Sequence, residues 1–271
     1  MKRRSRPAGR VSYNPRGNEI CFGYEDTSFW FRHRNGVILD ILKRFPPPGR
    51  LYDVGGGNGF VSKALQDAGV DVTLVEPGPV GARNARKRGV RRIVRARLED
   101  RRFRKGTLGA VGLFDVLEHI RDDGGFLRRV RETMAPEGRL YLTVPAGRFL
   151  WSDEDAVTGH FRRYGRRDLA ERLHSAGFRI EYVSRFFGFL WIPMFLARVM
   201  PYRLGIRKPN YDRFISRENR RHAPLGGVVL GSFVLFMRME RWLMSKTSMP
   251  FGTSLLVAAR KGNEVKNGRG S

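Results

Sequence analysis

The stretch Leu51-Tyr52-Asp53-Val54-Gly55-Gly56-Gly57-Asn58-Gly59-Phe60 joins a short apolar segment to a glycine-rich loop and then to the start of a helical pattern. Glycine has no Cβ atom, so such a loop can turn tightly and bring its backbone against a ligand. The backbone amides at the start of the following helix offer hydrogen-bond donors to the same ligand. The stretch therefore predicts a strand, a ligand-binding loop and a helix in succession.

Strand-like and helix-like patterns alternate on both sides of this loop. Strands are expected at 50–54, 71–75, 91–94, 109–114, 139–144, 178–183 and 254–259. Helices are expected at 26–45, 60–68, 80–88, 124–134 and 167–176. This rhythm predicts an α/β fold, a Rossmann-like and mostly parallel seven-stranded sheet with helices on both faces. An N-terminal helical arm and a helical insertion before the last strand complete the predicted fold.

The length of 271 residues, 41% of them hydrophobic, predicts one full core with additions rather than two domains. Residues 1–18 are basic and rich in Pro, Gly and Asn, which indicates a flexible arm. Residues 19–262 are expected to form the single domain, which includes a helical insertion or lid at 187–250. A flexible tail is expected at 263–271.

The charge balance is strongly basic, with 52 Lys and Arg against 26 Asp and Glu and a formal net charge of +26. Such a surface attracts phosphate, nucleic acid or anionic lipid, although a dispersed arginine excess on a solvated surface is an equal alternative. Cys21 is the only cysteine, so no intramolecular disulfide can form and a cytoplasmic location is expected. We find no secretory signal and no apolar run long enough for a membrane-spanning helix.

The spacing of the glycines distinguishes two classes of cofactor. A dinucleotide-binding loop follows G-x-G-x-x-G/A, but counting from Gly55 or Gly57 places Phe60 or Ser62 at the third glycine. A nicotinamide oxidoreductase is therefore the least favoured enzyme. The spacing present is D-x-G-x-G-x-G, which resembles the first motif of class I S-adenosyl-L-methionine-dependent methyltransferases.

In that family the loop holds the methionine moiety and the acid, here Asp53, helps to hold it. Glu76 ends the second predicted strand, where a carboxylate can accept both ribose hydroxyls; the alternative is an ordinary exposed glutamate. Arg97 stands where the family commonly has an acid for the adenine amine, so adenine is expected near Leu98 and Glu99 instead. The resemblance implies these cofactor-binding residues: Asp53, Gly55, Gly56, Gly57, Gly59, Glu76, Leu98, Glu99 and Asp115.

The resemblance extends over about residues 19–262. Residues 114–120 are similar to the V-L-E-H segment of the "methyltransferase type 11 and 12" group, and 127–145 to its L-x-P-G-G turn and fifth strand, with Glu137 in place of a usual glycine. Three further stretches, 29–35, 159–164 and 250–254, resemble a bacterial subgroup of unassigned or lipid- and sugar-associated methyltransferases. The resemblance thus indicates fold and cofactor more specifically than substrate.

Methyl transfer from a sulfonium requires alignment of donor and acceptor, and a base only where the acceptor must lose a proton. His119, His160 and Tyr164 follow predicted strands on the ligand side and are the candidate catalytic residues, with structural hydrogen bonding as the alternative for each histidine. Arg162, Arg163, Arg166 and Arg167 either bind an anionic substrate group or form a solvated charge run. No Cys/His cluster has metal-ligand spacing, so no metal is predicted.

The insertion contains two apolar runs, 186–197 and 225–237, with basic residues beside them. These runs form either buried helices or a lid that lines a hydrophobic acceptor pocket or docks on an anionic membrane surface from the cytoplasmic side. A methyltransferase with a small-molecule or lipid- or sugar-linked acceptor is the leading hypothesis. A nucleic-acid methyltransferase and a non-catalytic cofactor-binding module of a membrane-associated assembly are the alternatives. The net charge favours the nucleic-acid methyltransferase, but no RNA-binding module or Asn/Asp-Pro-Pro-aromatic motif is recognisable.

Overall fold

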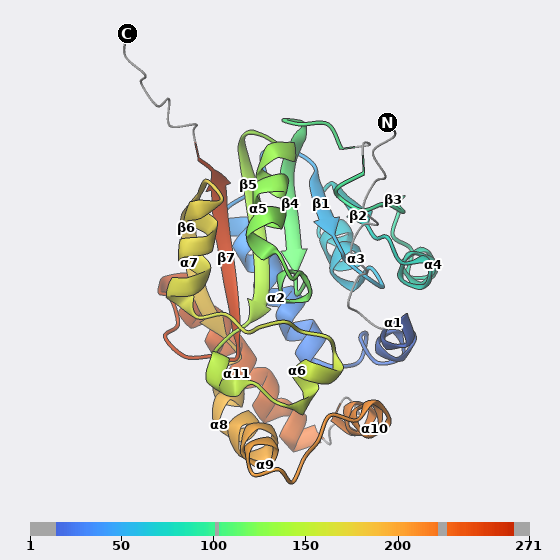
Figure 1. The fold of residues 1–271 in the computed structure, drawn as a ribbon, viewed down its shortest axis with the longest axis vertical. Coiled ribbons are helices and arrows are strands. Elements are labelled where there is room, and N and C mark those ends of the chain that lie inside the picture. The colour runs from blue at the N-terminus through green and yellow to red at the C-terminus, as the bar shows by residue number, and fades with distance from the viewer. Residues whose placement is uncertain (1–14, 101–102, 222–226, 263–271) are drawn as a thin grey trace, which may run out of the picture.

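The computed structural model describes residues 15–100, 103–221 and 227–262, drawn in colour in Figure 1. Its centre is one seven-stranded sheet in the order β3-β2-β1-β4-β5-β7-β6. The strands are β1 (Leu51–Val54), β2 (Val72–Val75), β3 (Ile93–Val94), β4 (Leu108–Phe114), β5 (Met134–Pro145), β6 (Phe178–Phe186) and β7 (Ser254–Lys261). The first five run parallel, while β7 lies antiparallel between β5 and β6. The predicted Rossmann-like, mostly parallel sheet is thus confirmed.

The strand order reverses at β1, whose neighbours are β2 on one side and β4 on the other. Asp53 of β1 lies beside Leu74 of β2 and Gly112 of β4. In open α/β sheets, ligands bind in the crevice outside the carboxyl ends of the strands at such a reversal. The topology therefore places the glycine loop, which follows β1, at the expected binding edge.

Helices cover both faces of the sheet. On one face lie α2 (Phe29–Arg44), α3 (Phe60–Asp67) and α4 (Pro79–Lys87), and on the other lie α5 (Asp123–Thr133) and α7 (Arg166–Ser175). Figure 1 shows α5 and α7 in front of the sheet and α2 behind it. The apolar periodicity of each helix explains this arrangement, because each helix buries one apolar stripe against the sheet.

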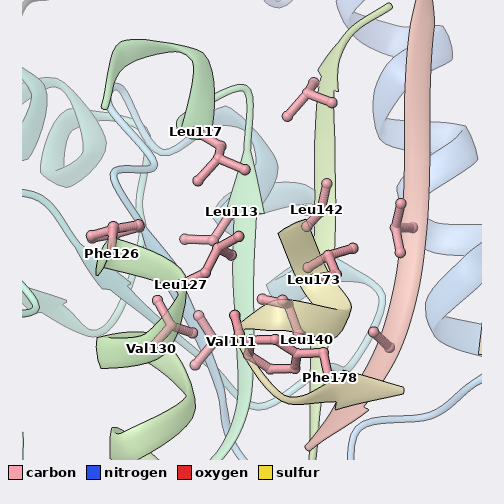
Figure 2. Packing of buried hydrophobic residues seen from close by; sticks show 14 of the residues in the cluster. Val111, Leu113, Leu117, Phe126, Leu127, Val130, Leu140, Leu142, Leu173 and Phe178 are labelled. Carbon is pink, nitrogen blue, oxygen red and sulfur yellow. The ribbon is translucent and has the colours of Figure 1, made fainter. Parts of the chain in front are cut away.

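The larger hydrophobic cluster fills the space between the sheet and the α5–α7 face. Figure 2 shows its centre, where α5 and α7 pack on β4 and β5. The labelled side chains are Val111, Leu113, Leu117, Phe126, Leu127, Val130, Leu140, Leu142, Leu173 and Phe178. Leu117 belongs to the short helix η1 (Leu117–His119), so the loop after β4 is fixed to the core at its first turn.

The insertion before β7 is helical, as predicted. It contains η3 (Gly188–Leu190), α8 (Trp191–Met194), the π-helical turn η4 (Phe195–Val199), α9 (Met200–Arg203), α10 (Tyr211–Arg221) and α11 (Gly227–Lys246). α11 packs along α2, while α8, α9 and α10 lie below the sheet in Figure 1, near α6 (Asp153–Val157). None of the helices in the described ranges is both long and apolar enough to cross a membrane.

The insertion is tied to the loop after β5, which contains η2 (Arg148–Leu150) and α6. Arg198 pairs with Glu154 at 2.7 Å, and Arg217 pairs with the buried Asp153 at 2.5 Å. The ring of Phe149 lies 5.9 Å from that of Trp191. These contacts place the insertion beside the loop in which the substrate residues were predicted.

Several boundaries differ from the sequence prediction by a few residues, and two of these differences have a clear structural cause. The expected flexible arm 1–18 overlaps α1 (Pro15–Phe22), because α1 packs on α4 and the Asn18 carbonyl accepts a hydrogen bond from Asn58 at 2.7 Å. The rest of that arm, 1–14, and the predicted tail 263–271 lie outside the described residues. β5 begins at Met134 rather than 139, since Met134 pairs with Leu108 of β4.

Glu137 has a left-handed backbone conformation, with φ of 59°. It stands at the position where the methyltransferase type 11 and 12 group usually has glycine. A residue with a Cβ atom is strained there. Its side chain, which is 59% exposed, pairs with Arg260 at 3.0 Å, an exposed contact of small value.

We expect Glu137→Gly to be more stable than Glu137→Ala by about 1 kcal/mol, because both variants lose the ion pair and only glycine relieves the strain. Urea unfolding of the two variants measures this difference. Equal stability of the two would contradict the assignment of strain.

Candidate active site

The glycine loop forms a left-handed bend after β1, with φ of 74° at Gly55, 53° at Gly57 and 72° at Gly59. A Cβ atom on Gly56 would lie 2.4 Å from the Leu74 side chain, and one on Gly59 would lie 2.8 Å from Ala85. Gly57 is different, since the nearest atom to its Cβ position is the Asn18 side-chain oxygen at 3.5 Å. The bend is therefore packed against the protein at Gly56 and Gly59 and more open at Gly57.

Glu76 leaves β2 directly beside this bend. Its Oε2 accepts a hydrogen bond from the Gly57 amide at 3.0 Å, and its Oε1 accepts one from the Gly78 amide at 2.6 Å. Burial raises the Glu76 pKa above its ordinary value, while these two amide donors oppose the shift. The carboxylate predicted to bind ribose thus lies beside the bend, and each oxygen keeps a second acceptor position for a diol.

Asp53 lies under the bend and is fully buried. Its Oδ2 accepts a hydrogen bond from the Ser62 hydroxyl at 2.6 Å, whereas its Oδ1 has no hydrogen-bond partner in the part of the chain that the structure describes. Burial raises the pKa of this carboxyl to about 6. A buried acid with an unsatisfied oxygen is costly by itself and is compatible with a nearby cationic ligand.

The loop after β4 closes the other side of the bend. Val116 lies against Gly55, where a Cβ atom would be 3.0 Å from the valine methyl group. Asp115, with φ of 58°, forms an ion pair with Arg34 of α2 and accepts a hydrogen bond from Thr143 at 2.9 Å. The predicted cofactor residue Asp115 is therefore held by α2 on one face of the sheet and by β5 within the sheet.

The two residues predicted near the adenine differ in exposure. Leu98 is buried and packs in the large core cluster with Val75, and Glu99 lies on the surface. The Arg97 amide donates a hydrogen bond to Asp100 at 2.9 Å, which forms a turn around these residues. The core position of Leu98 fixes the turn after β3, and the proposed adenine contact of either residue stays a prediction.

The two candidate catalytic histidines lie side by side. His119, at the end of η1, and His160, after α6, have ring centroids 4.8 Å apart. Burial and the neighbouring His160 lower the His119 pKa to about 3, which makes this imidazole a weak base at neutral pH. His160 Nδ1 contacts Asp155 Oδ1 at 2.9 Å, and its side chain is 17% exposed. His160 is thus the better placed of the two for proton transfer.

Tyr164, the third candidate, is fully buried. Its hydroxyl donates to the Leu117 carbonyl at 3.1 Å or to Asp123 at 3.0 Å, and burial raises its pKa. These bonds join the loop after β5 to η1. Tyr164 therefore orients the loops that contain both histidines.

The arginines after His160 separate into two kinds. Arg163 is buried and donates to Asp155 at 2.7 Å, and Arg162 pairs with Asp123 at 2.6 Å. Arg166 and Arg167 are exposed at the start of α7. Arg162 and Arg163 form internal ion pairs. Only Arg166 and Arg167 therefore fit the predicted solvated charge run.

A polar network that was not predicted from the sequence covers the bend from the N-terminal side. Arg88 Nη1 donates to the Asn58 carbonyl at 2.8 Å and pairs with Glu25 at 2.8 Å, and Asn84 donates to the Asn58 side chain at 3.0 Å. Arg88, Glu25 and Asn84, like Arg34, come from segments outside the loop. The only signal in the sequence was the resemblance of 29–35 to a known subgroup, which includes Arg34 but gave it no role.

A family model described as a methyltransferase domain matches residues 30–183, more than half of the chain. The chain belongs to this methyltransferase family. The matched part contains the glycine bend, Glu76, Asp115 and both clustered histidines. Within this family, a loop that has the spacing D-x-G-x-G-x-G and a neighbouring carboxylate fits S-adenosylmethionine.

Curated relatives of the methyltransferase domain include ubiquinone biosynthesis O-methyltransferases. The protein of Xylella fastidiosa is 30% identical over 152 residues, which cover 50% of this chain and 62% of that protein. The protein of Azorhizobium caulinodans is 35% identical over 126 residues, 41% of this chain and 50% of its own length. The chain thus spans about half to two thirds of these curated relatives.

Solved structures share the fold. A methyltransferase from Thermotoga maritima has a TM-score of 0.55 at 14% identity, covering 91% of this chain and 95% of that one. The phosphoethanolamine N-methyltransferase 2 of Haemonchus contortus, solved with S-adenosyl-L-methionine, has a TM-score of 0.56 at 18% identity, covering 94% and 59%. At these identities the likeness concerns the fold alone.

We expect Asp53→Asn to remove part of the pH dependence of folding stability. Because the folded-state pKa is about 6 and the ordinary value is 3.8, the unfolded chain releases this proton first as pH rises. The group's contribution to stability is therefore greatest below about pH 4, falls through pH 6 by roughly 2 to 3 kcal/mol, and is constant above.

Asparagine keeps an oxygen that can accept the Ser62 hydrogen bond but cannot titrate. The stability difference between Asp53→Asn and the unmodified chain, measured by urea unfolding from pH 4 to pH 7, should grow with pH. Parallel stability curves would refute the burial of an ionisable Asp53.

Proposed function

We propose that this protein is an S-adenosylmethionine-dependent methyltransferase that acts on an oxygen atom of a small-molecule or lipid-linked acceptor. The observation that carries the cofactor assignment is the contact between Glu76 and the Gly57 amide at the reversal of the strand order. This contact places a carboxylate that can bind a ribose diol next to the glycine bend. S-adenosylmethionine, when bound, supplies the methyl group as a sulfonium.

The chain's own residues have separate tasks in this proposal. Glu76 binds the ribose hydroxyls, and the Gly57 backbone lies against the methionine part. Asp115, fixed by Arg34 and Thr143, adds negative charge beside Gly55 for the cationic donor. His160 lies after β5 on the same edge, where it can position an acceptor hydroxyl. The insertion excludes water by covering the loop after β5.

The oxygen acceptor is supported by the relatives, because the similar curated proteins are O-methyltransferases. A hydrophobic, lipid-linked acceptor is supported by the exposed apolar side chains on the outer face of α11. Leu235, Met239 and Trp242 are 68%, 48% and 61% exposed, and their spacing puts them on one side of the helix. Arg238 and Lys246 are exposed on the same helix, so cations accompany the apolar side chains.

Apolar side chains accompanied by cations suit the surface of an anionic bilayer. We therefore propose that α11 contacts the membrane peripherally, from the cytoplasmic side, and that the acceptor is collected there. The net charge of +26 also favours RNA as an alternative acceptor. Transfer of labelled methyl groups to RNA rather than to lipid would favour that alternative.

The cofactor assignment predicts that Glu76→Ala weakens S-adenosylmethionine binding by about 10- to 100-fold. Loss of a charged acceptor for two hydroxyls removes about 1.5 to 3 kcal/mol of binding energy. Isothermal calorimetry measures the affinity, with NAD as a ligand that should not bind. Glu171→Ala is the matched control, since that exposed carboxylate of α7 is not among the predicted cofactor-binding residues. Equal affinity of the Glu76 variant and the unmodified protein would reject the site.

The acceptor assignment predicts that radiolabelled methyl groups enter the lipid-soluble fraction of a bacterial extract, and that the protein floats with anionic liposomes at low salt. Replacement of Leu235, Met239 and Trp242 by serine should reduce flotation several-fold, because the apolar contact with the bilayer is lost.

Ser245→Ala, an exposed change on the same helix, serves as the control. The serine variant should keep its affinity for S-adenosylmethionine, because the helix lies outside the cofactor site. Label confined to water-soluble small molecules, together with indifference to liposomes, would exclude the lipid-linked acceptor and leave the cofactor assignment intact.

A further inference from the structure

Three potential metal ligands meet at the carboxyl edge of the sheet. Glu118 and His119 come from η1, after β4, and His160 comes from the loop after β5. Each offers one ligand atom, and these atoms all lie within 4.8 Å of one another. Two ligand atoms of one ion lie at most about 4.4 Å apart, so a small closing movement of these side chains would let one ion contact all three.

Both imidazoles are held through a second contact. His160 Nδ1 lies 2.9 Å from Asp155 Oδ1, which leaves Nε2 for the cluster. Asp155 is itself fixed, because it accepts hydrogen bonds from Arg163 at 2.7 Å and from the Ser152 amide at 2.9 Å. The His119 ring makes a hydrogen bond with the Gly159 backbone. Metal-binding histidines are usually oriented in this way, by a carboxylate or a backbone carbonyl on the other nitrogen.

Glu118 provides an independent observation. Glu118 is only 1% exposed, and its Oε2 has no hydrogen-bond partner within the described residues. An unsatisfied buried carboxylate is costly. Among the described residues, the nearby Arg34 and Arg163 form their ion pairs with Asp115 and Asp155 rather than with Glu118. A bound cation would satisfy the free oxygen and the charge together.

We propose that Glu118, His119 and His160 bind one divalent first-row transition ion, such as Zn²⁺. Two imidazoles and one carboxylate favour such ions over Mg²⁺ or Ca²⁺, which prefer ligand sets of oxygen alone. Three protein ligands also leave a coordination position open for a ligand. Local spacing in the sequence predicts no metal, because these ligands come from two loops that only the fold brings together.

The position of the site gives the ion a role, and this role rests on the proposed methyltransferase function. η1 follows Val116, which lies against Gly55 of the cofactor bend. An acceptor hydroxyl bound at the open position would be oriented next to the bend, and its pKa would fall through contact with the ion. We therefore infer acceptors whose oxygen can ligate a metal, such as phenols or vicinal hydroxyls.

The test uses the untagged chain of 271 residues, stripped with chelator and titrated with Co²⁺ and Zn²⁺. Co²⁺ should bind with a visible d–d absorption band, at a stoichiometry of about one ion per chain, and Zn²⁺ should displace it. His160→Asn and Glu118→Gln should each weaken binding by at least about 10-fold. His174→Asn, which removes an exposed histidine of α7 outside the cluster, should bind normally.

Calorimetry with S-adenosylmethionine on every variant shows that it is folded and separates the two proposals. Loss of metal binding in His160→Asn, with cofactor affinity retained, supports the site. Cofactor binding without metal binding in the unmodified protein, or metal binding that His160→Asn leaves unchanged, overturns it. Metal binding at the cluster without cofactor affinity would reject the methyltransferase proposal and retain the metal site.

Discussion

The binding edge depends on a close approach of backbone to backbone around the glycine bend. A Cβ atom on Gly81 of α4 would lie 2.9 Å from the Gly57 carbonyl oxygen, and one on Gly59 would lie 2.8 Å from Ala85 of the same helix. Because those side chains are absent, α4 can pack against the bend, and Glu76 can reach the Gly57 amide. The left-handed φ angles at Gly57 and Gly59 are the local cost of this arrangement.

The rest of the edge is assembled from loops that charged side chains hold together. Arg34 joins α2 to the loop after β4 through Asp115, while Asp155 holds His160 and Arg163 in the loop after β5. The insertion reaches the same loop through pairs to α6, one of them with the buried Asp153. Loops that carry function are commonly positioned in this way by a rigid sheet. Here the polar contacts define where donor and acceptor can meet.

Much of the fold was predictable, because apolar runs and glycine spacing are local signals. The strands around Asp53 and Glu76 and the loop between β1 and α3 lie where the pattern put them. The missed features are contacts between remote segments, such as the pair of Arg34 with Asp115 and the cluster of Glu118 with His160. No local periodicity encodes such a meeting. α1 was assigned partly to a flexible arm for the same reason, since its order comes from Asn58 and α4 rather than from its own composition.

Glu240 of α11 accepts hydrogen bonds from the amides of Phe187 and Gly188, at 3.0 Å and 2.6 Å, and its carboxylate contacts the His33 ring at 2.6 Å. Both His33 and Glu240 are buried. One carboxylate thus satisfies polar groups of α2 and of the chain leaving β6. Excising the 187–250 segment to obtain a minimal catalytic unit would remove Glu240 and leave the buried His33 imidazole without its carboxylate partner. What looks like a removable appendage is a structural part of the domain, and shortened homologues would need a different residue at position 33.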